Sequence, residues 1–242
     1  MTEVCLSDVR GCHEAARVLE VAAAGNHSVL FVGSMGTGRT MLARRLPSIL
    51  PPLEDPRPFR APHHTVSTRG FFGTIERPGE LELAHHGVLY LDEALDFAPD
   101  FVRGALDAMR NGVTGNMRRS AACHVVAAVD ACPCGRIGVR TCSCTADQRW
   151  LHAYRVERLA SAFDLVLRLH QPDPTGAPCE SSAVVQARVT AARAGLARLA
   201  LSTERTTRVA QTVAALAGCT TVTREHLLTA NRWLPCYFKM EV

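Results

Sequence analysis

The stretch VLFVGSMGTGRTMLARRL, Val29 to Leu46, decides the fold. It begins with a short continuous apolar run, which is typical of a strand buried on both faces. Three glycines follow, and helical periodicity then resumes until Pro51 and Pro52 end it. A strand, a glycine loop and a helix in this order can cradle phosphates, because backbone N–H groups and the start of a helix face the anion. The sequence therefore predicts a nucleotide-binding α/β domain.

One position of this loop departs from the usual pattern. Arg39 stands where phosphate-binding loops carry lysine, and arginine keeps the charge but presents a wider planar fork on a longer stem. The alternative is a glycine turn between strand and helix that holds no ligand. Thr40 supplies the hydroxyl expected on Mg²⁺. The predicted nucleotide contacts are the loop and the start of its helix: Gly33, Ser34, Met35, Gly36, Thr37, Gly38, Arg39, Thr40 and Met41.

A second motif favours a nucleotide site over the bare turn. VLYLDE, Val88 to Glu93, is an apolar run that ends in two acids and follows the loop by roughly 50 residues. In nucleoside triphosphatases the aspartate of such a strand holds Mg²⁺ and the glutamate polarises water. Ligands of open α/β sheets bind at the carboxyl ends of the strands, where both motifs lie. We therefore expect Thr40 and Asp92 on Mg²⁺ and Glu93 in catalysis.

The rest of the chain divides at a proline-rich linker, Pro172 to Pro178. Residues 1–172 are predicted to form the α/β nucleotide-binding core and residues 179–242 a helical lid. The core is expected to contain helices over Val9–Ala24, Arg39–Leu50 and Asp100–Gly112, and strands over Ser28–Gly33, Gly87–Ala94, Cys123–Ala131 and from Phe163. In the lid, helical patterns cover Ser181–Leu199, Thr206–Ala217 and Arg224–Trp233.

Composition restricts the class of protein. The chain has 242 residues, 47% hydrophobic and 21% charged, and its net charge of +4 is only weak evidence for nucleic acid binding. No apolar run reaches the roughly 18 residues of a membrane span, and no secretory leader is apparent. We therefore expect a soluble cytoplasmic protein, in which cysteines are reduced or bind metal.

The ten cysteines fall into two groups. Cys132, Cys134, Cys142 and Cys144 form two CxC pairs around a glycine turn, and four such thiolates can close around Zn²⁺. Reduced thiols and redox chemistry are the alternatives. A closed structural site would leave no open position for catalysis. Six cysteines stand alone and are expected to be small buried apolar residues: Cys5, Cys12, Cys123, Cys179, Cys219 and Cys236.

Two histidine pairs could suggest a metal-binding site, but loop packing is the better interpretation. His63 and His64, like His85 and His86, are adjacent in the sequence. Neighbouring side chains on an extended segment point in opposite directions, so loop packing is the expected role of both pairs.

Several further segments carry a resemblance to a known family. These are RPFRAPHHT (57–65), RPGELELAHHGVLYLDE (77–93), CPCG (132–135) and ESSAVVQARVTAAR (180–193). With the phosphate loop, they make the sequence similar to the magnesium-chelatase-like AAA+ ATPases of the ComM (YifB) type. The resemblance implies an AAA+ core with a helical lid, assembly into rings, and an ATP-driven motor on DNA for branch migration, recombination and transformation. Relatives of this kind usually carry an additional amino-terminal Lon-like domain, and we expect this sequence to start directly at the AAA+ module.

At several positions this sequence differs from the pattern of the family that it resembles. Asp130 stands where the family has an asparagine that orients water beside the γ-phosphate, and Ala162 stands where it has an arginine that reaches a neighbour's nucleotide. Arginine fingers contribute about 10³ to 10⁵ in rate, so its loss predicts poor turnover. The lid arginine that senses nucleotide is Arg205, Arg208 or absent. The resemblance places Arg118 and Arg119 in a hairpin that projects into the ring pore, where they would contact DNA phosphates. A solvated turn is the alternative.

Three functions remain open. The first is an active AAA+ ATPase coupled to DNA. The second, which Arg39, Asp130 and Ala162 favour, is an ATP-binding protein with impaired or absent hydrolysis, such as a regulatory subunit in a homo- or hetero-oligomeric ring. The third is a zinc-stabilised DNA-binding or assembly module whose nucleotide site is vestigial.

Overall fold

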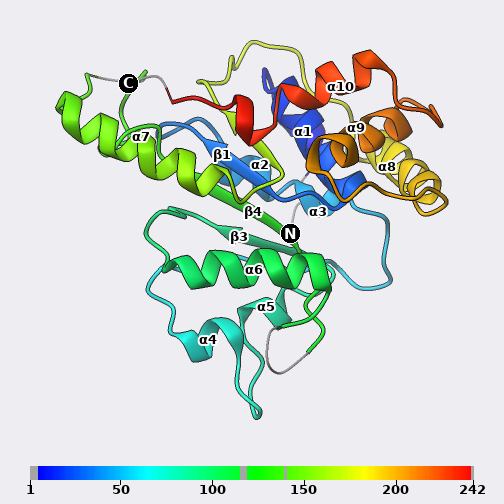
Figure 1. Ribbon diagram of the computed structural model, residues 1–242, viewed down its shortest axis with the longest axis horizontal. Helices are drawn as coiled ribbons and strands as arrows, with labels where there is room; N and C mark the ends of the chain where they lie inside the picture. The colour runs from blue at the N-terminus through cyan, green and yellow to red at the C-terminus, as the bar shows by residue number, and fades with distance from the viewer. Residues whose placement is uncertain (1–4, 115–118, 139–140, 241–242) are drawn as a thin grey trace.

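Five parallel strands form the centre of the molecule in the order β2-β3-β4-β1-β5 (Figure 1). The computed structural model describes residues 5–114, 119–138 and 141–240. The strands are β1 Val29–Val32, β2 Phe59–Arg60, β3 Val88–Leu91, β4 His124–Val129 and β5 Leu165–Arg168. Residues of β1, β3 and β4 are buried on both faces of the sheet, as their continuous apolar sequence predicts. The four predicted strands are confirmed, and the short edge strand β2 was not predicted.

Helices cover both faces of the sheet. One face packs against α1 His13–Gly25, α2 Arg39–Ala43, α3 Leu46–Ile49, α8 Ser182–Leu196, α9 Arg205–Leu216 and α10 Arg224–Asn231. The other packs against α4 Thr68–Phe72, α5 Glu80–Leu83, α6 Pro99–Asn111 and α7 Ala146–Ala160. Short 3₁₀ helices cover Leu6–Asp8 and Pro235–Tyr237. The chain therefore folds as an α/β protein with helices on both sides of a parallel sheet, as predicted.

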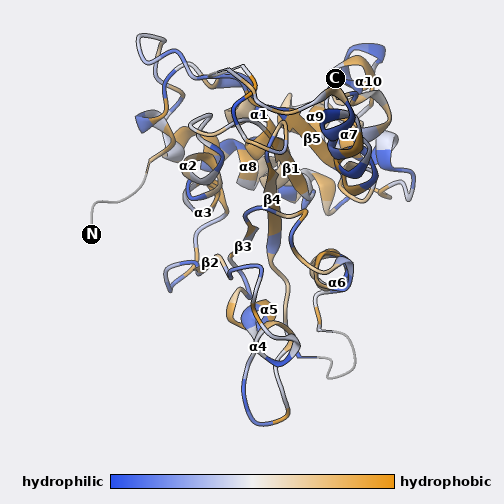
Figure 2. Ribbon diagram, turned by 90° about the vertical axis from the view of Figure 1, so that its left-hand side faces the viewer, coloured by the Kyte–Doolittle hydropathy of each residue, from blue (hydrophilic) through white to orange (hydrophobic). Residues whose placement is uncertain are grey.

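The strands divide their side chains between the two hydrophobic clusters. Phe31 and Tyr90 belong to the cluster under α1, whereas Leu30 and Leu89 belong to the cluster under α6. This alternation follows from the two-residue period of a strand. Figure 2 shows the hydrophobic residues gathered along β1, β4 and β5, with hydrophilic residues on the outer loops.

Two helical predictions are wrong in detail. The single helix expected over Arg39–Leu50 is two short helices, because Pro47 has no N–H and its ring clashes with the carbonyl of a continuing helix. The first helix begins at His13 and not at Val9, after Gly11 adopts a left-handed φ of 66°. Both predicted helix ends at glycine, Gly25 and Gly112, are close to the observed ends.

Helix α7 was missed altogether. It is 15 residues long and begins with a capping box, in which Thr145 and Gln148 satisfy each other's backbone N–H groups. The threonine and the glutamine three residues later were the available signal.

The carboxyl-terminal helices α8 and α9 pack directly on α1 and share its hydrophobic cluster. Val185 and Val189 of α8 are buried there, as is Val209 of α9. The division into a core and a lid at residues 172 and 179 stays a prediction. No helix in the described part of the chain combines the length and the apolar character that crossing a membrane requires.

Candidate functional site

The loop between β1 and α2 has the backbone of a phosphate-binding loop. Gly36 and Gly38 adopt left-handed φ angles of 82° and 86°, which residues with a Cβ rarely tolerate. The N–H of Gly33 donates to the carbonyl of Val129 on β4 at 3.1 Å, and this bond fixes the start of the loop to the sheet. Side chains of the loop support it from within, since the Thr37 hydroxyl donates to the carbonyl of Ser34 at 2.9 Å.

Contacts from outside complete the support of this loop. The N–H of Met35 donates to the carbonyl of Gly135 at 2.9 Å, and Gln171 Nε2 donates to the carbonyl of Met35 at 3.1 Å. The Ser34 hydroxyl donates to the carbonyl of Ile137. Other amides of the loop are not used by these bonds: those of Gly36 and Gly38, for example, donate to no acceptor within the described ranges. The loop is therefore held in shape with free donors for an anion.

The proposed Mg²⁺ ligands lie at the same edge of the sheet. The Thr40 hydroxyl is 3.2 Å from the Tyr90 hydroxyl, which donates to Asp92 Oδ1 at 3.1 Å. Burial raises the pKa of Tyr90, so its hydroxyl stays protonated and bridges the two residues. Tyr90 was not among the predicted site residues, because its apolar strand suggests only core packing.

Arg39 and Asp130, the two departures from the expected pattern, contact each other. Arg39 Nη2 lies 2.8 Å from Asp130 Oδ1, and the two side chains are 14% and 33% exposed. Arg39 Nη1 is buried without a hydrogen-bond partner. Met41, the last predicted loop contact, packs against the hydrophobic cluster under α1.

Glu93, the predicted catalytic acid, follows Asp92 in a left-handed conformation with a φ of 52°. Its Oε2 lies 3.5 Å from His64 Nδ1, and these two residues with Asp96 place three potential metal ligands within 4.8 Å of one another. The rings of His63 and His64 lie 4.1 Å apart, and those of His85 and His86 lie 3.7 Å apart. The expectation that adjacent histidines point in opposite directions is therefore wrong, because both pairs lie in turns and not in extended chain.

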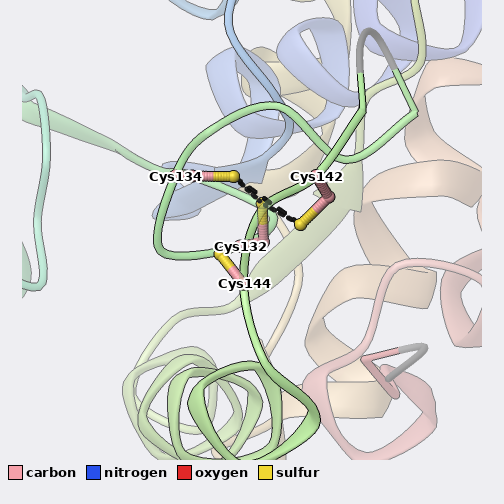
Figure 3. Close-up of side chains that lie close together, drawn as sticks. All are labelled: Cys132, Cys134, Cys142 and Cys144. Carbon is pink, nitrogen blue, oxygen red and sulfur yellow. Dashed lines mark hydrogen bonds between the residues drawn. The ribbon is translucent and has the colours of Figure 1, made fainter.

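The four paired cysteines converge at the same end of the sheet (Figure 3). Their sulfur atoms lie 3.5 Å apart between Cys132 and Cys134, 3.6 Å between Cys134 and Cys142, and 3.8 Å between Cys142 and Cys132. Four sulfurs at tetrahedral zinc bond lengths are separated by about 3.8 Å. Cys144 completes the group, whose ligand atoms all lie within 4.8 Å. The donor set and its spacing therefore fit Zn²⁺.

The single cysteines are not all buried. Cys123 and Cys179 are buried, as expected, and burial raises the pKa of both thiols. Cys5 and Cys12 are half-buried. The expectation is wrong for Cys219 and Cys236, which are exposed near the ends of surface helices.

The predicted DNA contacts are only partly visible. Arg118 lies outside the described residues. Arg119 forms an ion pair with Glu82 at 3.0 Å and donates to the carbonyl of Ile75. Its guanidinium is therefore engaged within the chain, and the DNA contact stays a prediction.

Ala162, at the position where the family has an arginine, borders a cavity of about 550 Å³. Arg110 of α6 donates to the Ala162 carbonyl at 3.1 Å, and Arg155 of α7 donates to the Leu95 carbonyl at 3.0 Å. The lining contains no acidic side chain and five arginines, from three helices: Arg103, Arg110, Arg155, Arg158 and Arg205. No sequence signal indicated this cluster, because its members come from separate segments.

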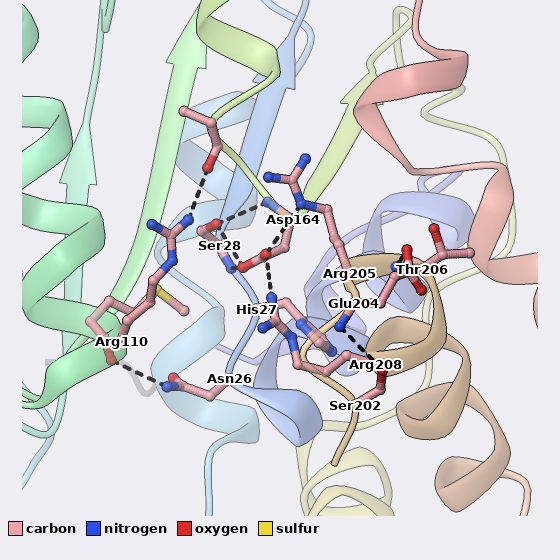
Figure 4. A network of polar contacts seen from close by, with 12 residues as sticks. Asn26, His27, Ser28, Arg110, Asp164, Ser202, Glu204, Arg205, Thr206 and Arg208 are labelled. Atoms are coloured by element: carbon pink, nitrogen blue, oxygen red, sulfur yellow. Dashed lines mark hydrogen bonds and ion pairs between the residues drawn. The ribbon is translucent and has the colours of Figure 1, made fainter.

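The two arginines expected to sense nucleotide lie elsewhere. Arg208 Nη2 lies 2.7 Å from Asp164 Oδ1, and Arg205 Nε lies 3.7 Å from the same oxygen (Figure 4). Asp164 directly precedes β5, so it lies at the amino edge of the sheet, whereas the phosphate loop follows the carboxyl end of β1. Of the three alternatives, this arrangement favours the absence of such an arginine, because both candidates pair with Asp164 at the edge away from the loop.

Comparison with known proteins identifies relatives over most of the chain. The family model described as magnesium chelatase, subunit ChlI, matches residues 5–56 and 54–174. YifB of Escherichia coli is 37% identical over 229 residues, covering 78% of this chain and 44% of YifB. Competence protein ComM of Haemophilus influenzae is 43% identical over 130 residues, covering 43% of this chain and 25% of ComM. The chain thus spans less than half the length of these relatives.

Proposed function

This chain belongs to the family of magnesium chelatase subunit ChlI, of the ComM and YifB type, and we propose that it binds Mg·ATP, hydrolyses it poorly and acts on DNA. Family membership makes it an AAA+ ATPase-type protein. The observation that carries the proposal is the shared edge of the sheet, where a loop with free amides faces the Thr40–Tyr90–Asp92 chain. The residues proposed to hold the phosphates and those proposed to hold Mg²⁺ lie together at this edge, which supports the proposal.

The residues have separable roles in nucleotide binding. The free amides of Gly36 and Gly38 are suited to hold phosphate oxygens. Thr40 and Asp92 would hold Mg²⁺, which supplies charge neutralisation of the phosphates when bound. Tyr90 keeps these two side chains at a fixed separation, and Glu93 stands next to Asp92 to orient water.

Weak hydrolysis follows from the residues that replace catalytic groups. The guanidinium of Arg39 is directed to Asp130, so its charge is already neutralised in the absence of nucleotide. The acid at position 130 cannot donate to water or phosphate as an amide would. Ala162 supplies no positive charge to the nucleotide of a neighbouring subunit. The candidates to supply it in its place are the arginines that line the adjacent cavity.

The test measures nucleotide binding and phosphate release on the same preparation. We expect Mg²⁺-dependent ATP binding, little phosphate release and no large stimulation by DNA. Release that DNA stimulates strongly would instead support an active motor. The double variant Arg39→Lys with Asp130→Asn should improve ATP binding or turnover, with Arg69→Lys and Asp55→Asn as a charge-matched control on exposed positions.

Failure to bind nucleotide at all would leave a second candidate function. This is a DNA-binding or assembly module stabilised by zinc, which the convergence of the four cysteines favours. Metal analysis should give one Zn²⁺ per chain, lost in Cys132→Ser and retained in Cys219→Ser. A metal-free protein with unchanged thermal stability would contradict a structural zinc site.

The finer features of the proposal come from the relatives. Assembly into a homo- or hetero-oligomeric ring, a cytoplasmic location, and DNA contact through Arg118 and Arg119 are each proposed on family resemblance. A regulatory subunit that binds ATP without turnover in a mixed ring fits the impaired site. Sedimentation with and without ATP and DNA tests the ring, and dissolution of any assembly by Arg119→Ala alone would argue against a DNA role for that residue.

A further inference from the structure

Asp130 is placed next to the phosphate loop by the sheet itself. It directly follows β4, and β4 pairs in parallel with β1, with Val129 beside Val32. The Asp130 carbonyl accepts a hydrogen bond from His152 Nε2 of α7 at 2.8 Å, which anchors its backbone from the other side. The carboxylate therefore extends from a fixed point at the base of the loop.

Two contacts define where this carboxylate lies. On one side is Arg39 Nη2 at 2.8 Å. On the other is Gly135, at a left-handed φ of 67°, where an added Cβ would lie 3.1 Å from Asp130 Oδ2. The carboxylate is thus confined between the loop cation and the backbone of the cysteine segment.

The contact between Arg39 and Asp130 affects ligand binding because of where Arg39 lies in the loop. The cation at this place in a phosphate loop reaches the β- and γ-phosphates of a nucleotide. Here a carboxylate already occupies one edge of its guanidinium, while Nη1 is buried with no hydrogen-bond partner. The Asp130 carboxylate is therefore an anion that already pairs with the loop cation, and Nη1 of that cation has no acceptor among the described residues.

We propose that Asp130 stands in for the terminal phosphate opposite Arg39, so that the site binds nucleoside diphosphates in preference to triphosphates. This rests on the proposed nucleotide-binding function and specifies its ligand. A diphosphate can use the Gly36 and Gly38 amides of the loop. A third phosphate adds negative charge beside a carboxylate, and like charges at short range in a partly buried site repel strongly.

The acids on the neighbouring strand do not create the same preference. Asp92 accepts from Tyr90 and is a proposed ligand of Mg²⁺, whose positive charge offsets it. Glu93 is 56% exposed and lies against His64. Asp130 is the acid that contacts the loop cation, so removing its charge should act selectively on the triphosphate.

The experiment compares two ligands on two charge-matched variants. Isothermal titration calorimetry with Mg²⁺ measures the Kd of ADP and of a non-hydrolysable ATP analogue for the wild-type chain, Asp130→Asn and Asp55→Asn. Asp55 is an exposed acid in a surface turn. We expect the wild type to bind ADP about tenfold more tightly than the analogue, equivalent to about 1.4 kcal/mol. Asp130→Asn should remove this preference by strengthening analogue binding, and Asp55→Asn should leave it unchanged.

Asp130→Glu keeps the charge and should retain the preference for ADP, which guards against a structural effect of the amide. Equal affinities of the wild type for both ligands would overturn the inference, as would an equal gain for both ligands in Asp130→Asn. Absence of binding by either ligand, with an unchanged thermal unfolding profile, would instead overturn the proposed nucleotide function.

Discussion

The two edges of the sheet each carry an arginine–aspartate pair, and the pairs are built differently. At the amino edge, Asp164 accepts from the Ser28 N–H at 3.1 Å, from the Ser28 hydroxyl at 3.0 Å and from Arg208 at 2.7 Å. At the carboxyl edge, Arg39 is the one ion-pair partner of the Asp130 carboxylate among the described residues. Arg39 Nη1 has no hydrogen-bond partner among them. A carboxylate whose oxygens are all engaged stabilises a fold, whereas a pair with unused donors is available to a ligand.

The charges at the amino edge follow from this packing. Burial would raise the pKa of Asp164, but the hydrogen bonds from Ser28 and the positive charge of Arg208 hold its pKa below the usual range. His27, behind the pair, shares a hydrogen bond of 2.9 Å with the Thr212 hydroxyl. Burial lowers the pKa of His27 to about 4, so this ring is neutral at pH 7. The amino edge joins α9 to the sheet, and both carboxylate oxygens of Asp164 accept hydrogen bonds there.

The comparison is broken or supported most directly by removing each aspartate. Asp164→Ala should cost about 3 to 5 kcal/mol of unfolding free energy, because it leaves buried partners without an acceptor. Asp130→Ala should cost less than about 1 kcal/mol, since its pair is partly exposed and incompletely hydrogen-bonded. Urea unfolding followed by circular dichroism measures both. Equal losses of unfolding free energy would mean that both pairs stabilise the fold to the same extent. The pair at the carboxyl edge would then have no distinct role in ligand binding.

Lowering the pH should reduce the free energy of unfolding through the buried histidine at the amino edge of the sheet. The pKa of His27 is about 4 in the folded chain, against an ordinary value of about 6.5. Between these values the unfolded chain binds the additional proton, so stability falls as pH decreases through this window. The loss from His27 is about 2 kcal/mol at pH 5. Burial also lowers the pKa of His124 to about 3, and this residue acts in the same direction.

Urea midpoints at pH 7, 6 and 5 measure this effect. In His27→Gln, the fall of stability with decreasing pH should become smaller. In His13→Gln, at the exposed start of α1, it should be unchanged. A slope that persists in full in His27→Gln would contradict the assignment.

The smallest expected effect concerns the bridge at the carboxyl edge. Tyr90→Phe removes the hydroxyl between Thr40 and Asp92, and a lost hydrogen bond of about 1 kcal/mol corresponds to about fivefold in affinity. The loss should appear in nucleotide binding with Mg²⁺ and be reduced without it. Tyr154→Phe, on the exposed face of α7, is the matched control. Equal losses with and without Mg²⁺ would assign Tyr90 to packing alone.

Several features were predictable because they depend on neighbours in the chain. The phosphate loop, the acidic strand end and the helix end at Gly112 each follow from residues within a few positions. The split of α2 from α3 also has a local signal, because Pro47 cannot continue a preceding helix. Helix α7 had a capping signal at Thr145, but its weakly amphipathic sequence gave no strong periodicity.

The sequence by itself determined the parts of the site: a glycine loop that can present amides, two acids at a strand end, four thiols at close spacing, and the departures Arg39 and Asp130. These depend on local backbone chemistry and residue type. Only the tertiary structure decided which parts meet, because β4 lies beside β1 although the two strands are about 90 residues apart in the chain. That adjacency turned two separate departures into one ion pair, and the packing of α9 on α1 carried Arg205 and Arg208 to the opposite edge.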